Sequence, residues 1–231
     1  MHVVVMAAGE GRRLRPLTER WPKPVLPIDG RPVLATLLRE LAAANVSRVY
    51  LVTGHLAEQV ERLAGDGRAF GLDVQNVRQP GVLGSADAVR RAVDVGAAAP
   101  FLVSAADTVY RRGDVRRFAE AYRASGAAGA IAVRRDPPRG PARPGIRVLN
   151  GLVEAIGADE SPLSGAPLWA LDEPVVSRLC LDREPWELES AFRAALAAGA
   201  RIAAIEIGKT RDLTDPLDLV EENFPYLGAW T

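Results

Sequence analysis

Short apolar runs alternate with amphipathic stretches through the first 133 residues of this chain. The runs are rich in valine and leucine, which is typical of strands buried on both faces in a parallel sheet. The expected strands cover residues 3–7, 48–53, 72–77, 101–104 and 130–133. Between them, apolar residues recur at helical spacing, as at Leu34, Leu37 and Leu41, and predict amphipathic helices. The expected helices begin at Pro32 and cover residues 57–63, 85–93 and 114–124. This alternation predicts an α/β fold with a mainly parallel sheet flanked by helices.

The later part of the pattern adds a hairpin, an irregular stretch and a helical tail. The dipeptide Asn150-Gly151 separates two apolar runs, residues 146–149 and 152–156, and is a strong signal for a two-residue hairpin turn. Residues 134–145 hold four prolines and two glycines, which excludes regular structure. This stretch is either a surface loop or an arginine-bearing flap over an anionic ligand. A helix near 187–198, a strand at 201–207 and a last helix from Pro216 complete the pattern.

Composition narrows the class of protein. Basic and acidic residues balance at 29 each, which argues against a protein that coats nucleic acid, because that function needs a large basic excess. The single cysteine, Cys180, excludes an intramolecular disulfide. No apolar run reaches the length of a membrane span, and the N-terminus lacks the pattern of a signal peptide. We therefore expect a cytoplasmic protein, one domain over residues 1–231, without nucleic-acid or membrane partners.

A glycine-rich, basic loop after the first expected strand is the main candidate for chemistry. It reads GEGRRLRPLT over residues 9–18, and PKP follows at 22–24. Two glycines let backbone N–H groups approach an anion closely. Cationic donors stand at Arg12, Arg13, Arg15 and Lys23. A solvated basic face is the plainer interpretation, but the position after a strand and a glycine turn favours a polyphosphate site.

Three phosphate-binding patterns compete for this loop. The dinucleotide-binding fingerprint needs a third glycine where Leu14 stands, and the P-loop needs Gly-Lys-Ser/Thr, which is absent. The third pattern, G-x-G-x-R-L-x-P-L-T followed by P-K-P, resembles the signature of sugar-1-phosphate nucleotidylyltransferases. The resemblance implies a Rossmann-like sheet of the nucleotide-diphospho-sugar transferase type with an added β-hairpin. It also implies Mg²⁺-dependent transfer of a nucleotidyl group from a nucleoside triphosphate to a sugar 1-phosphate, with release of pyrophosphate.

Further landmarks follow in the family's order and imply a set of site residues. The nucleotide would be bound by Ala7, Ala8, Gly9, Gly11, Arg13, Gln79, Gly84 and Ser85. Arg13 and Lys23 would be catalytic, holding the leaving phosphates and the α-phosphate respectively. Asp107 and Asp212 would bind the metal. Plainer interpretations exist: a helix cap for Asp107 and turn positions for Asp212 and Gln79.

The acceptor side departs from the family's pattern. Many members carry Glu-Lys-Pro on a strand there, but this chain has Val153-Glu154-Ala155-Ile156 without a lysine. An unpaired phosphate in a partly desolvated pocket is costly, so another cation is expected. The candidates are Arg143, Arg147 and Lys209, and the implied acceptor site comprises Glu154, Gly165, Arg147 and Lys209. The run IRVLNGLVEAIG is similar to the corresponding hairpin of inositol-1-phosphate cytidylyltransferases, which keeps CTP and a polyol phosphate open.

Two other functions remain in competition. One is a non-catalytic regulatory relative that binds nucleotide sugar, although such proteins usually lose the basic loop, the lysine or an aspartate. The other is a glycosyltransferase, which usually has a D-x-D motif that Ala105-Ala106-Asp107 does not supply. No hexapeptide repeat precedes Thr231, so a C-terminal β-helix domain is not expected. Related enzymes are often dimers or tetramers, and a homo-oligomer is compatible with this chain.

Overall fold

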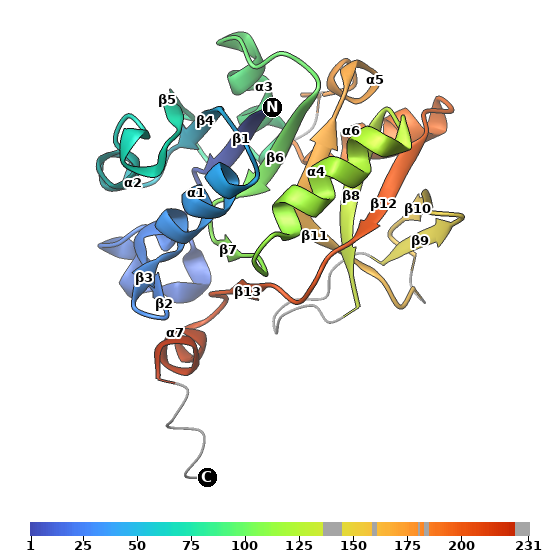
Figure 1. Ribbon diagram of the computed structural model, residues 1–231. Helices are drawn as coiled ribbons and strands as arrows, with labels where there is room; N and C mark the ends of the chain where they lie inside the picture. Colours follow the sequence, from blue (N-terminus) through green and yellow to red (C-terminus); the bar gives the residue numbers. More distant parts are fainter. Residues whose placement is uncertain (136–144, 159–160, 180, 183–184, 225–231) are drawn as a thin grey trace.

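A nine-stranded mixed sheet forms the centre of the molecule within the residues that the computed structural model describes, 1–135, 145–158, 161–179, 181–182 and 185–224. Cys180, Arg143 and the rest of residues 136–144 lie outside these ranges. The strand order is β5-β4-β1-β6-β11-β8-β12-β10-β9 (Figure 1). The strands are β1 His2–Ala7, β4 Arg48–Thr53, β5 Asp73–Arg78, β6 Phe101–Ala105, β8 Gly129–Arg134, β9 Ile146–Leu149, β10 Leu152–Ile156, β11 Ser164–Leu171 and β12 Ile202–Glu206.

The sheet is mainly parallel, as the sequence pattern predicts. Strand β1 is parallel to β4 and β6, and β12 is parallel to β8, whereas β11 and β10 run against the rest. Val3, Val4 and Val5 of β1 are fully buried, because helices cover both faces of a parallel sheet. The predicted hairpin is also confirmed: β9 and β10 pair across Asn150 and Gly151, both with positive φ.

Helices pack on the two faces of the sheet, and alternation along β1 directs its side chains to both. Val3 and Val5 join the core under α1 (Val33–Ala43), α2 (Ala57–Ala64) and α4 (Asp114–Ser125). Val4 joins the core under α3 (Ser85–Asp94), α5 (Glu173–Val176) and α6 (Leu188–Ala197). In the described part of the chain, no helix is both long and apolar enough to cross a membrane.

Several short elements connect the loops at one edge of the sheet. Hydrophobic periodicity did not predict them. They include two ribbons, β2 (Pro27–Ile28) with β3 (Arg31–Pro32), and β7 (Thr108–Val109) with β13 (Arg211–Asp212). The helix α7 (Pro216–Asn223) follows β13 and lies beside the β2–β3 ribbon (Figure 1). A small third core unites these segments and consists of Leu14, Leu26, Ile28, Val33 and Leu213.

One sequence expectation is wrong. Arg134 was placed at the start of the irregular stretch, but it is the last residue of β8 and its exposed fraction is only 1%. The strand continues through Arg134 because its side chain meets buried partners from a distant segment, Thr210 and Asp212. Periodicity along the strand could not show these partners.

Candidate functional site

A cavity of about 490 Å³ opens at the carboxyl ends of β1 and β6. Its walls are the end of β1, residues 9–14, Lys23-Pro24, Val82, residues 105–107 after β6, and Leu213-Thr214 after β13. Ligands of parallel α/β sheets bind at this edge. Three of the predicted residues, Arg13, Lys23 and Asp107, therefore face one cavity, and the fourth, Asp212, immediately precedes its wall.

The glycine loop makes a tight turn at Gly11, where the side chain of Thr18 lies close to the backbone. Gly11 has a left-handed φ of 62°, and a Cβ there would come 2.9 Å from Cγ2 of Thr18. A Cβ on Gly9 would meet nothing within 4 Å, so the backbone is accessible at that position. Leu14 is buried in the third core and anchors the short helix Arg12–Leu14, which leaves Arg13 exposed at the cavity wall.

Glu10 already engages two of the loop's arginines. Its carboxylate accepts from Nε of Arg12 at 2.7 Å and from Nη2 of Arg15 at 3.3 Å. The hydrogen bond with Arg12 holds the pKa of Glu10 below its ordinary value. Arg12 and Arg13 both line the cavity, and because Glu10 engages Arg12, Arg13 is favoured as the arginine that meets an anion there.

Thr18 and His55 secure this loop, and sequence reasoning assigned neither of them to the site. The Thr18 hydroxyl donates to the Gly11 carbonyl at 3.0 Å, and Nε2 of His55 lies 2.6 Å from the Thr18 carbonyl. Because a carbonyl can only accept, Nε2 carries the hydrogen. The backbone N–H of His55 also donates to the Ala8 carbonyl at 3.3 Å. His55 therefore ties the loop to the ends of β1 and β4.

Lys23 and Asp107 form an ion pair across the cavity. Nζ of Lys23 lies 2.5 Å from Oδ2 of Asp107, and the two side chains are 18% and 31% exposed. Pro22 and Pro24 flank the lysine, and a short helix, Lys23–Val25, orients it. The structure thus brings together a predicted catalytic residue and a predicted metal ligand.

Asp212 is brought beside Asp107 by the β7–β13 ribbon. In that ribbon Asp212 pairs with Thr108, the residue after Asp107. Both carboxylates act on the buried phenol of Tyr110, which donates to the Pro167 carbonyl at 2.6 Å. Burial chiefly raises the pKa of Tyr110, and the negative charges of Asp212 and Asp107 raise it further. Two carboxylates near one phenol form the oxygen-rich, negatively charged environment that a hard divalent cation prefers.

Within the described ranges, no group of three or more His, Cys, Asp and Glu side chains is arranged to hold a metal. A cation between Asp107 and Asp212 would thus take its remaining ligands from water or phosphate oxygens, which is the way Mg²⁺ is usually bound. The donor set fits a metal that arrives with a polyphosphate.

Arg134 is a buried cation beside Asp212. Its Nη2 lies 3.8 Å from Oδ2 of Asp212, and its Nη1 donates to the Thr210 hydroxyl. Both charged side chains are almost fully buried, so each offsets part of the other's desolvation cost. Arg134 and the pairing of β13 with β7 therefore both contribute to the position of Asp212.

A second cavity of about 420 Å³ shares Glu10 and Val82 with the first. Ala8 and Gln79 line it, as do Gly54 and His55. The Gln79 amide group donates to the Gly84 carbonyl at 3.1 Å and to Asp87 at 2.7 Å, so both of its N–H groups serve the fold.

Gly84 and Ser85 lie at the start of α3 and contact the start of α6. Neither residue is among the described lining residues of the two cavities. A Cβ on Gly84 would overlap the Trp186 carbonyl, which accepts from the N–H of Ala86. The Ser85 hydroxyl lies 2.5 Å from the Glu187 carboxylate and accepts from the Leu188 N–H at 2.7 Å. These contacts join the first turn of α3 to the first turn of α6.

The four acceptor residues are not gathered in one described cavity. Arg147 and Glu154 pair with each other on the exposed β9–β10 hairpin, with Nε of Arg147 at 3.3 Å from Oε2 of Glu154. Gly165 lines a separate, mostly apolar cavity of about 160 Å³ beside Trp169. Lys209 is exposed between β12 and β13.

Comparison with known proteins places this geometry in a family context. A family model described as Nucleotidyl transferase matches residues 2–151. N-acetylmuramate alpha-1-phosphate uridylyltransferase of Neisseria meningitidis serogroup B is 34% identical over 110 residues, which cover 47% of this chain and 48% of that protein. Glucose-1-phosphate thymidylyltransferase of Streptomyces griseus is 28% identical over 234 residues, covering 96% of this chain and 65% of that protein. Each match thus spans less than two thirds of the relative's own length.

Solved structures of other proteins share the fold of this chain. The structure of a putative glucose-1-phosphate thymidylyltransferase from Bacillus anthracis superposes with a TM-score of 0.83 at 18% identity. The superposition covers 96% of this chain and 94% of that one. At this identity the likeness concerns the fold, and it confirms the predicted α/β architecture.

Proposed function

The chain belongs to the nucleotidyl transferase family, and on this basis we propose that it transfers a nucleotidyl group from a nucleoside triphosphate to a sugar 1-phosphate. The products are a nucleoside diphosphate sugar and pyrophosphate. The observation that carries the proposal is the shared cavity of Arg13, Lys23 and Asp107, with Asp212 at its border.

The residues around this cavity suit a reaction that needs positioning and charge neutralisation. The oxygen of the sugar phosphate attacks the α-phosphorus in line, and pyrophosphate leaves from the opposite side. Backbone N–H groups at Gly9 and Gly11 bind the triphosphate, and Arg13 holds the leaving phosphates. Preorganised donors of this kind stabilise the charge that develops in the transition state.

Lys23 has two partners in this proposal. In the structure it is paired with Asp107. When the triphosphate is bound, its ammonium group turns to the α-phosphate and the incoming phosphate, and Asp107 is released for the metal site. We assign Mg²⁺ to Asp107 and Asp212, where it would neutralise charge on the phosphates.

The nucleobase is proposed to lie in the second cavity, next to Ala8 and Gln79. The names of the two relatives above refer to different nucleotides, uridylyl and thymidylyl, so family membership leaves the base open. Small residues line part of this wall, at Ala8, Gly54 and Gly81, and there the base would meet backbone groups. Gly84 and Ser85 would shape the loop beside the base.

A cytidylyltransferase that acts on inositol 1-phosphate or a similar polyol phosphate is the second candidate. The observation that favours it is the β9–β10 hairpin, which lacks the lysine of the Glu-Lys-Pro pattern and instead carries Arg147 paired with Glu154. Arg147 would meet the acceptor phosphate after leaving Glu154, with Lys209 and Gly165 as further acceptor contacts.

Pyrophosphate release tests both candidates. The protein is incubated with Mg²⁺, each of the five common nucleoside triphosphates, and a panel of sugar and inositol 1-phosphates. Release with one base and one acceptor class identifies the reaction. Absence of release across the panel, combined with binding of a nucleotide sugar, would instead favour a regulatory relative.

A further inference from the structure

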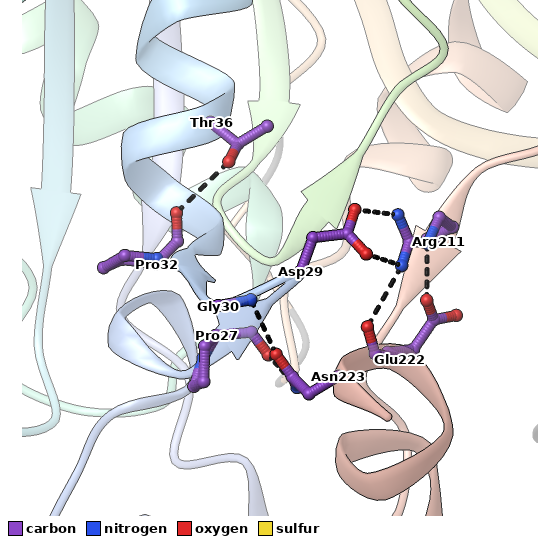
Figure 2. Close-up of polar contacts among 8 residues, drawn as sticks. All are labelled: Pro27, Asp29, Gly30, Pro32, Thr36, Arg211, Glu222 and Asn223. Atoms are coloured by element: carbon purple, nitrogen blue, oxygen red, sulfur yellow. Dashed lines mark hydrogen bonds and ion pairs between the residues drawn. The ribbon is translucent and has the colours of Figure 1, made fainter. Parts of the chain in front are cut away.

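Arg211, the neighbour of Asp212 in β13, is held by carboxylates from two other segments (Figure 2). Its Nη1 and Nη2 lie 2.5 and 2.8 Å from the two carboxylate oxygens of Asp29, in a bidentate arrangement. Its Nε donates to the Glu222 carboxylate, and its Nη2 donates to the Glu222 carbonyl at 3.2 Å. A planar guanidinium with this many bonds has a fixed orientation.

The two segments that hold Arg211 are also bonded to each other. Asp29 and Gly30 form the turn of the β2–β3 ribbon, and Glu222 and Asn223 end α7. The Asp29 N–H donates to the Glu222 carbonyl at 3.2 Å, and the Gly30 N–H donates to Oδ1 of Asn223 at 2.9 Å. The Asn223 amide donates in return to the Pro27 carbonyl at 2.8 Å (Figure 2). The turn and the helix end thus form one bonded unit around Arg211.

This unit connects two parts of the candidate site. The β2–β3 ribbon begins four residues after Lys23, and β13 contains Asp212 itself. Successive side chains of a strand point to opposite sides. Arg211, whose side chain is 34% exposed, is held on the outer side, while the side chain of Asp212 is 5% exposed on the inner side. Holding Arg211 therefore sets the rotation of β13 about its own axis, and with it the direction of the Asp212 carboxylate.

We propose that Asp29 and Glu222 are positioning residues that act through Arg211 to hold Asp212 in the geometry required for a divalent cation. The proposal rests on the proposed function and deepens it. Mg²⁺ requires nearly ideal octahedral geometry, and residues that orient metal ligands typically change metal affinity by about 10- to 100-fold. An exposed ion pair, in contrast, contributes little to folding stability. The Asp29 side chain is 62% exposed and gives the cleaner test, whereas that of Glu222 is 25% exposed.

The test compares metal affinity with thermal stability in the full chain. Mn²⁺ with pyrophosphate serves as the probe, because two carboxylates leave the remaining ligands to phosphate oxygens. Free Mn²⁺ is followed by electron paramagnetic resonance during titration, and a titration of pyrophosphate without protein gives the baseline that is subtracted. The variants are Asp29→Asn and Glu222→Gln, since asparagine tolerates the positive φ of 51° at residue 29. The matched control is Asp73→Asn, which breaks another exposed arginine–aspartate pair, Arg48–Asp73. These two residues begin β4 and β5, so they lie at the amino ends of the strands, opposite the candidate site.

We expect both test variants to bind Mn²⁺ about tenfold more weakly than the wild type. Their Tm should fall no further than that of Asp73→Asn. The proposal would be overturned if both test variants bound Mn²⁺ with the affinity of the wild type. It would also be overturned if both variants were unfolded, because the contacts of Arg211 would then serve folding. If the wild type itself neither binds Mn²⁺ nor releases pyrophosphate, the proposed function fails; if it does both and the variants match it, only the positioning role fails.

Discussion

Nζ of Lys23 lies 2.5 Å from Oδ2 of Asp107, so the two groups assigned to the α-phosphate and to the metal neutralise each other in the structure. The pair keeps an ammonium group and a carboxylate in place at the cavity wall, and both side chains are partly exposed. Substrate binding exchanges this internal pair for two intermolecular ones. The pairing therefore holds both charged groups at the cavity wall, where the substrates are proposed to bind.

Lys23→Ala should lower turnover at least about 10²-fold, because the developing charge on the phosphates loses the cation assigned to the α-phosphate. The side chain is partly exposed and lies outside the hydrophobic cores, so Tm should change little. Steady-state pyrophosphate release and thermal melting provide the two readouts, with Arg68→Ala on the surface as a control cation. A large loss of Tm with normal turnover of the folded fraction would make Lys23 structural.

Asp107→Asn should also cut turnover at least about 10²-fold, through loss of metal charge stabilisation. The substitution preserves the shape of the side chain while removing its negative charge. Raising the Mg²⁺ concentration should partly restore the rate if the variant binds the metal weakly. Near-normal turnover at low Mg²⁺ would exclude Asp107 as a metal ligand.

Gly11→Ala should destabilise the protein more than Gly30→Ala does. Both glycines have left-handed φ, 62° and 67°, so both substitutions carry the same backbone penalty of about 1 kcal/mol. Only at Gly11 would the new methyl group also crowd Thr18, since a Cβ at Gly30 meets nothing within 4 Å. Urea denaturation of the two variants measures the difference, and equal losses would show that the glycine loop adapts freely.

Tyr110→Phe should lower the free energy of unfolding by about 1 kcal/mol at pH 7, because a buried hydrogen bond to the Pro167 carbonyl is lost. The pKa of Tyr110 is raised above 10 in the fold, chiefly by burial. The folded state therefore retains the proton at a pH at which the unfolded chain has lost it, and this contribution to stability decreases as pH rises above 10. The gap between wild type and variant should thus narrow in alkaline urea titrations. If the difference in free energy of unfolding grew at alkaline pH instead, the pKa of Tyr110 would not be raised in the folded state.

Arg134→Leu should destabilise the protein by about 3 kcal/mol, because it leaves the Asp212 carboxylate buried without its cation. Adding Asp212→Leu should recover part of this loss, since the uncompensated charge is then removed. A double-mutant cycle from chemical denaturation measures the coupling. Additive losses would mean that the 3.8 Å contact contributes nothing.

The sequence predicted the sheet and its helices because buried strands and amphipathic helices each have a regular hydrophobic period. It did not predict the β7–β13 ribbon. Each of these strands has only two residues, too few to show a hydrophobic period, and they form only because the two segments pair in the folded protein. Arg134 was misplaced for the same reason: its partners, Thr210 and Asp212, are more than seventy residues away. The glycine loop and the two aspartates were found through a motif, whereas the clamp on Arg211 is visible only in three dimensions.

Transfer of label from an α-³²P nucleoside triphosphate tests the central claim most directly. The account predicts that label enters a nucleotide sugar in the presence of the matching sugar or polyol phosphate, with one pyrophosphate released per product. It also predicts that omission of the acceptor stops both, and that the change Lys23→Ala lowers both at least about 10²-fold. Release of pyrophosphate without an acceptor, or unchanged transfer in Lys23→Ala, would contradict it.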